Sequence, residues 1–122
     1  MEHTVQDEQM QLIIQRLHKL QHDLSEEITG LREMLSEVGG DREQFDTSER
    51  SDALQQRNMA KANVMLSERR LHLVEAALRR IDEGDEDFGY CRSCDAGIPF
   101  ARLSVRPESP LCLNCQQQQE VR

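Results

Sequence analysis

Four cysteines in two pairs constrain the fold of this chain more than any other feature. The pairs are Cys91–Cys94 and Cys112–Cys115, each of the form C-x2-C, with seventeen residues between them. No other cysteine occurs in the 122 residues. Two such pairs at this separation are typical of a tetrahedral zinc site in which each pair supplies two thiolates. Because four thiolates complete the coordination shell, we predict one structural Zn²⁺ with no open position for a substrate.

Two other uses of these cysteines fit the sequence less well. Disulfides form in oxidising compartments, and neither a signal-peptide-like apolar stretch nor a membrane helix precedes the cysteines. A C-x-x-C redox pair usually lies at the strand-to-helix turn of a βαβ unit, and neither pair has that context. We therefore expect a cytoplasmic protein with reduced thiols and no membrane association.

Composition and charge limit the remaining functions. Aromatic residues make up 3% and charged residues 31%, and the mean hydropathy is −0.72. A large core is therefore not expected, and bound zinc would contribute folding free energy to a small C-terminal module. The formal net charge is −8 at pH 7, which is opposite to that of a nucleic-acid-binding zinc ribbon. The charge favours a basic protein surface or a metal-bearing cleft as the partner, and not DNA.

Apolar residues between positions 10 and 84 follow the repeat of a two-helix coiled coil. Steps of three and four residues alternate in two stretches, so each stretch predicts a helix with one apolar stripe. Gly39 and Gly40 predict a helix end and a turn, and a turn this short requires the helices to run antiparallel. The stripe residues are Met10, Ile13, Leu17, Leu20, Leu24, Ile28, Leu31, Leu35 and Val38, then Ala53, Arg57, Ala60, Val64, Ser67, Leu71, Val74, Leu78 and Ile81.

The first half of the second stripe is weak, because small and polar residues occupy it. Asp46 or Ser48 could cap the start of that helix. An intermolecular coiled coil is the alternative arrangement of the two stripes. The short turn favours a hairpin within one chain, and we expect a monomer.

The acidic segment 82–87 separates the hairpin from the cysteines, and we interpret it as a solvated linker in which Gly84 ends the second helix. Apolar residues around the cysteines predict a small core of short strands and turns, and residues 113–122 predict a short helix carrying Cys115. The predicted fold is mainly α, a long antiparallel two-helix coiled-coil hairpin with a small C-terminal four-cysteine zinc-finger module. Residues 1–9 are predicted to be a flexible N-terminus, 10–84 the hairpin with its tip around 39–52, and 85–122 the module.

The C-terminal segment resembles the DksA/TraR family of bacterial transcription regulators. The resemblance rests on the run Asp85-Glu-Asp-Phe-Gly-Tyr-Cys91, the cysteine spacing and the close Leu111-Cys-Leu-Asn-Cys115-Gln. The sequence resemblance is strong over residues 85–116. Over residues 10–84 only the predicted architecture, a long antiparallel helical hairpin, is similar. The resemblance implies a protein that binds RNA polymerase and inserts its hairpin through the secondary channel. Acidic residues at the tip then alter open-complex stability, often together with the alarmone ppGpp.

The resemblance places the functional tip at the start of the second helix, in one of two frames. The family pattern D-x-x-D-x-A matches Asp46, Glu49 and Ser51 in the first frame. A shifted frame uses Glu49 and Asp52. In either frame one aspartate has become glutamate, which moves the carboxylate by one methylene. The ordinary roles of these residues are helix capping and, for Glu49, a first-turn acid favoured by the helix dipole.

Two departures from the family pattern carry expectations of their own. Asp95 stands where the family commonly has glycine, which predicts a left-handed backbone that aspartate tolerates. Alarmone-binding relatives carry a basic residue where this chain has Leu73, so ppGpp is only a candidate ligand. Basic residues near that position are Arg69, Arg70, Arg79 and Arg80.

Enzymatic chemistry is not expected, because no phosphate-binding loop, H-E-x-x-H motif or nucleophilic array occurs. His18 and His22 lie four residues apart without further ligands, and we interpret them as solvated helix residues. The alternative function is a zinc-ribbon nucleic-acid-binding or protein-interaction module without polymerase activity. Its small basic face would be formed by Arg92, Arg102 and Arg106.

Overall fold

The computed structural model describes residues 6–40 and 47–121, with side chains described within 6–36 and 51–120. Over these residues the fold is helical, and the only β interaction is one isolated antiparallel bridge between Tyr90 and Gly97. The mainly α class is confirmed, whereas the short strands predicted around the cysteines are wrong for the described residues. The helices are α1 (Asp7–Gly40), α2 (Thr47–Asp82), α3 (Phe100–Val105) and α4 (Leu113–Val121).

The start of α1 is set by polar residues. The Gln6 N–H donates to Oε1 of Gln9 at 3.1 Å, and the Met10 N–H donates to the Gln6 carbonyl at 2.8 Å. A glutamine that reaches back to the N-cap N–H forms one half of a capping box. Asp7 and Glu8 add the negative charge that a helix N-terminus favours. The helix therefore begins at Asp7 and not at Met10, where the apolar stripe begins.

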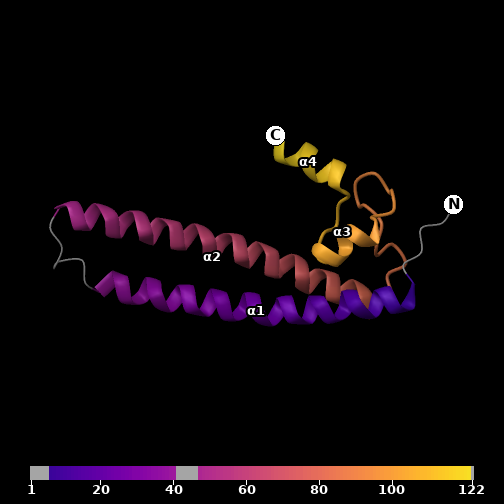
Figure 1. The fold of residues 1–122 in the computed structure, drawn as a ribbon, viewed down its shortest axis with the longest axis horizontal. Coiled ribbons are helices and arrows are strands. Elements are labelled where there is room, and N and C mark those ends of the chain that lie inside the picture. The colour runs from indigo at the N-terminus through magenta and orange to yellow at the C-terminus, as the bar shows by residue number, and fades with distance from the viewer. Residues whose placement is uncertain (1–5, 41–46, 122) are drawn as a thin grey trace. The chain divides into compact units, whose positions relative to one another are not determined.

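The described part of the chain divides into two compact units. The first contains the residues up to Gln21 together with those from His72 onward, and the second contains residues 22–71. Within each unit, α1 and α2 lie side by side and run in opposite directions (Figure 1). The predicted antiparallel hairpin is therefore confirmed. None of the helices in the described residues is both long and apolar enough to cross a membrane.

The predicted stripes are the faces along which α1 and α2 pack. Every stripe residue with a described side chain is buried or half-buried. Burial of these side chains is the main source of stability for two amphipathic helices that have little other core. The most buried stripe residues are Ile13, Leu17 and Val74 in the first unit, and Leu24, Ile28, Ala60 and Val64 in the second.

Helix α3 forms where strands were predicted, and Pro99 supplies the reason. Proline has no N–H to contribute to a β ladder, and its fixed φ suits the approach to a helix. The Pro99 carbonyl accepts hydrogen bonds from the N–H groups of Arg102 and Leu103 at 3.0 and 3.1 Å. Leu103 is 1% exposed, and the Arg16 guanidinium of α1 donates to the Ser104 carbonyl. The short helix is thus held against the base of the hairpin.

Gly84 ends α2 as predicted, through a Schellman motif. Gly84 has a φ of 73°, in the left-handed region where glycine carries no Cβ penalty. Its N–H donates to the Ile81 carbonyl at 3.1 Å, and the Asp85 N–H donates to the Arg80 carbonyl at 2.9 Å. These are the two hydrogen bonds that define the motif. The chain therefore leaves α2 in a fixed direction toward the cysteines.

Burial along α1 predicts unequal effects of two identical substitutions. Leu17 is 0% exposed and Leu12 is 45% exposed. Leu17→Ala should lower the free energy of unfolding by about 2–5 kcal/mol because it leaves a cavity in the seam. Leu12→Ala should lower it by roughly 1 kcal/mol or less. Chemical denaturation of the zinc-loaded protein, followed by circular dichroism, measures both, and equal losses would contradict the observed packing.

Candidate metal centre

The four cysteines converge on one point in the C-terminal segment. Their sulfur atoms all lie within 4.8 Å of one another, and Sγ of Cys94 is 3.7 Å from Sγ of Cys112. A regular tetrahedron with Zn–S bonds of about 2.3 Å places its sulfurs about 3.8 Å apart. Disulfide sulfurs would be about 2.05 Å apart, and all four cysteines are free. The donor set and its spacing therefore fit one zinc ion held by four thiolates.

Backbone turns direct the thiols of both pairs. In the first pair the Cys91 N–H donates to the Ala96 carbonyl at 2.7 Å, and the Asp95 N–H donates to the Cys91 carbonyl at 2.9 Å. Asp95 has a φ of 62°, so the predicted left-handed conformation is confirmed. In the second pair the Cys115 N–H lies 3.5 Å from Sγ of Cys112. Such N–H···S contacts orient a metal ligand.

Arg102 of α3 organises the loop that leads into the second pair. Its Nε donates to the Leu111 carbonyl at 3.2 Å, and its Nη2 donates to the Ser109 hydroxyl oxygen at 3.2 Å. The Ser109 hydroxyl in turn donates to the Leu111 carbonyl at 2.8 Å. The Arg92 N–H donates to the Pro110 carbonyl at 2.9 Å, which ties the first pair to the same loop. Sequence reasoning placed Arg102 on a basic face, whereas the structure engages it in supporting the metal site.

The electrostatics of the cluster call for a cation. Burial raises the pKa of Cys91, but backbone hydrogen bonds with Cys112, Cys94 and Ser93 outweigh it and lower that pKa to about 6. Hydrogen bonds with the Cys112 and Cys91 thiols, together with burial, raise the pKa of Cys115 to about 12. A thiol that donates a hydrogen bond to a neighbouring sulfur keeps its proton, so without a metal the thiols of this cluster do not all ionise together. A bound divalent cation would replace these protons and allow all four to coordinate as thiolates.

A polar network joins the end of α2 to the first pair of cysteines. Nε of Arg80 donates to Oδ2 of Asp85 at 2.9 Å, and the Arg80 guanidinium carbon lies 5.6 Å from the centroid of the Phe88 ring. Oδ1 of Asp85 accepts the Asp87 N–H at 2.9 Å. The hydrogen bond from Arg80, followed by that from Asp87, holds the pKa of Asp85 below its ordinary value of 3.8. One residue of the predicted solvated linker is therefore structural, and Arg80 is already engaged.

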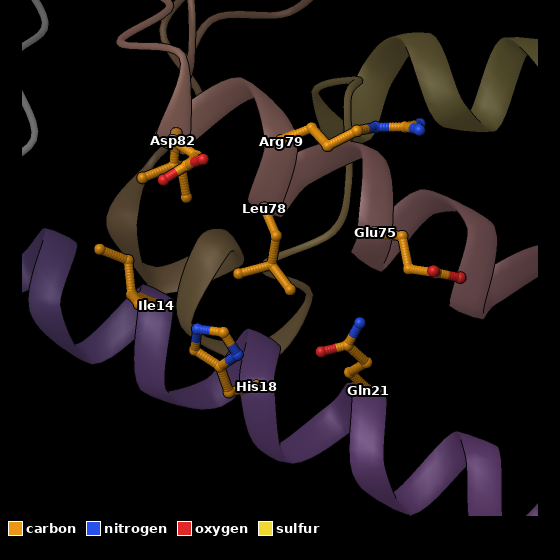
Figure 2. A pocket seen from close by; sticks show the side chains of 8 residues that line it. Ile14, His18, Gln21, Glu75, Leu78, Arg79 and Asp82 are labelled. Atoms are coloured by element: carbon orange, nitrogen blue, oxygen red, sulfur yellow. The ribbon is translucent and has the colours of Figure 1, made fainter.

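A groove of about 510 Å³ lies between α1 and α2 in the first unit. Figure 2 shows His18 and Gln21 of α1 extending toward Leu78 and Glu75 of α2.

Over the described residues, the cysteines form the only group of three or more side chains placed to hold a metal. His22 lies 3.2 Å from Glu26 on the same helix face and is 70% exposed. Both histidines thus match their interpretation as solvated helix residues.

Only part of the predicted tip lies within the described residues. Asp46 is outside them. Glu49 belongs to the first turn of α2, with its side chain outside the described part. Ser51 and Asp52 are exposed on α2, and Ala53 is half-buried. The choice between the two frames of the tip therefore stays a prediction.

Comparison with known sequences links the metal centre to a group of bacterial proteins. Residues 86–120 match the family model described as prokaryotic dksA/traR C4-type zinc finger. Over 49 residues the chain is 43% identical to the RNA polymerase-binding transcription factor DksA of Escherichia coli K12, covering 40% of this chain and 31% of that protein. Over 76 residues it is 34% identical to the DksA of Buchnera aphidicola, covering 62% of this chain and 46% of the relative. The matched segments therefore span less than half the length of these relatives.

Among solved structures, the transcription factor DksA2 from Pseudomonas aeruginosa has the same fold. The TM-score is 0.75 at 22% identity, covering 95% of this chain and 86% of that chain. Fold and cysteine cluster together define a helical-hairpin protein with a C-terminal four-cysteine zinc finger that holds one structural Zn²⁺. Residues 86–120 are therefore a zinc finger of the DksA/TraR type, and the chain shares the fold of DksA2.

Loss of one thiolate should disrupt the metal centre. The purified protein should contain one Zn²⁺ per chain by elemental analysis. Cys94→Ser should weaken zinc binding by more than the roughly 10–100-fold typical of losing an outer-shell contact. Asn114→Ala is the matched control, because Asn114 lies inside the second pair and is exposed. Competition with a chromophoric chelator measures both, and unchanged affinity of the Cys94 variant would exclude coordination by four thiolates.

The Arg80–Asp85 contact predicts a pH-dependent contribution to stability. Because the pKa of Asp85 is lower in the folded than in the unfolded state, its stabilisation is complete well above pH 3.8 and is lost as the pH falls through the folded pKa. Asp85→Asn should lower the thermal midpoint at neutral pH, and its difference from wild type should shrink in acid. Glu86→Gln, at an exposed neighbour, should show no such difference. Acid also protonates the zinc thiolates, but this affects wild type and both variants equally, so it cancels when their thermal midpoints are compared at the same pH. A difference in midpoint between wild type and Asp85→Asn that does not change with pH would refute the ion pair.

Proposed function

We propose that this protein is a transcription regulator that binds bacterial RNA polymerase and acts through its secondary channel. One joint observation carries the proposal. The zinc finger is 43% identical over 49 residues to proteins named for binding RNA polymerase, and the fold of a related transcription factor extends over 95% of the chain. Similarity in the zinc finger alone would support only a shared metal site. Similarity of the hairpin supports a shared way of reaching a partner.

The hairpin has the features that such a route requires. α2 contains 36 residues, which corresponds to about 54 Å at 1.5 Å per residue. The protein as a whole has a formal net charge of −8. A negative charge suits a channel whose inner end holds basic residues and Mg²⁺. Two packed helices carry an end group into a channel without the ordering cost that a flexible segment would incur.

Carboxylates at the start of α2 are the proposed effectors. Asp52 is exposed, so its charge is available to a partner in the shifted frame, whereas Asp46 is the leading acid of the other frame. A carboxylate near a catalytic metal ion acts through position, and displacement of about 1 Å can change the effect greatly. The protein would therefore regulate the polymerase and would not itself catalyse a reaction.

Binding and function can be separated by neutral variants of the tip. Wild type should bind purified polymerase and shorten the lifetime of the open complex on a ribosomal RNA promoter. Asp46→Asn and Asp52→Asn should both still bind, and the variant that no longer shortens the lifetime identifies the functional frame. Asp23→Asn makes the same charge change at an exposed position of α1 and should behave as wild type. Absence of binding by folded, zinc-loaded wild type would refute the proposal.

The same assay tests ppGpp as a ligand. If ppGpp and this protein act jointly, adding both should shorten the lifetime by more than the sum of their separate effects. Arg80 is held by Asp85, which removes one of the four arginines near Leu73 from the candidates for such a site. An additive response would exclude ppGpp as a co-effector.

A further inference from the structure

Arg57 occupies a stripe position of α2, where an apolar side chain is the usual occupant. Its side chain is half-buried, and its Nη1 donates to the Leu35 carbonyl of α1 at 3.3 Å. Its Nε is fully buried and has no hydrogen-bond partner in the described part of the chain. A buried donor without a partner destabilises a fold relative to an apolar side chain of similar shape. The arginine therefore lowers the stability of the seam in which it lies.

The neighbours of Arg57 leave room for its long side chain. Ala53 and Ala60 lie four residues before it and three after it, on the same face of α2. Ala60 is 3% exposed, so the face is closely packed despite the small side chains. These alanines allow the guanidinium to lie across the seam and reach the backbone of α1. This position therefore suits a long side chain that ends in a hydrogen-bond donor.

Packing alone specifies the register of this unit weakly. On the α2 side, small or polar residues occupy the first half of the seam around Arg57, and Val64, Ser67 and Leu71 follow. Small side chains interlock less deeply with the opposite helix than leucine or isoleucine do. The cross-helix ion pair Arg32–Glu68 is 63% and 42% exposed, and exposed pairs contribute little. The Arg57–Leu35 hydrogen bond is a part-buried polar contact across this seam.

A polar residue in a coiled-coil seam can specify register at a cost in stability, because a shifted register buries it without its partner. We propose that Arg57 is the positioning residue for the tip. It fixes the register of α1 against α2 and so holds the start of α2, including Asp52, in place relative to α1. The link to polymerase rests on the proposed function, whereas the role in register does not.

Three variants and a distance measurement test the role in register. Spin labels on p-acetylphenylalanine at Ser36 and Gln55, both exposed in the second unit, leave the zinc thiolates unmodified. Wild type should give one narrow distance distribution by pulsed electron paramagnetic resonance. Arg57→Leu should give a broadened or two-component distance distribution. Arg57→Lys, which keeps a long side chain with a hydrogen-bond donor at its end, should give a narrow distribution like that of wild type. Lys61→Leu removes the same charge from an exposed position one turn away and should stay narrow.

Stability and polymerase response separate positioning from simple support of the fold. Arg57→Leu should have a thermal midpoint equal to or above that of wild type, bind polymerase, and no longer shorten the open-complex lifetime. A narrow distribution for Arg57→Leu would overturn the proposal. So would a lowered midpoint in parallel with the broadening, because that result describes a structural residue. If wild type does not bind polymerase, the proposed function fails, and the distance distributions still decide whether Arg57 sets the register.

Discussion

Coordination of one zinc ion by four thiolates is the constraint on which the C-terminal part of the fold depends. The described segment after α2 contains few fully buried apolar side chains, chiefly Ile98 and Leu103. A core of that size contributes little folding free energy, and the metal supplies the rest by joining two segments seventeen residues apart. Once these segments are joined, Pro99 begins α3 and the Arg16 guanidinium holds that helix to α1.

The two compact units differ in what specifies their packing. In the first, Ile13, Leu17 and Val74 are fully buried, and large interlocking side chains leave one stable register. In the second, small side chains and Arg57 occupy the first half of the α2 seam, and larger ones follow only at Val64 and Leu71. The effector carboxylates are expected at the end of the second unit. The residues that make the packing of α1 against α2 most stable therefore lie in the first unit, whereas Arg57, proposed to fix their register, lies in the second.

Predictions succeeded where the physical cause is local and failed where it is not. Alternating steps of three and four residues report which face of a helix is apolar, and Gly84 ends α2 because its left-handed φ is a local requirement. The strands expected near the cysteines are absent from the described residues, where one isolated bridge joins Tyr90 and Gly97. Proline before Phe100 was the signal that could have indicated a helix there.

The sequence by itself determined the helical faces, the turn signals and the four metal ligands. Each depends on the spacing of residue types along the chain, and two C-x2-C pairs at this separation are typical of a zinc site of four thiolates. Tertiary structure decided the roles of Arg57, Asp85 and Arg102. Their residue types alone indicate solvated charges, and their partners come from another helix or from beyond the next turn. Folding decides how deeply a charged side chain is buried and which hydrogen-bond partners surround it, and these two properties determine whether it is structural. Neither property can be inferred from the residue type.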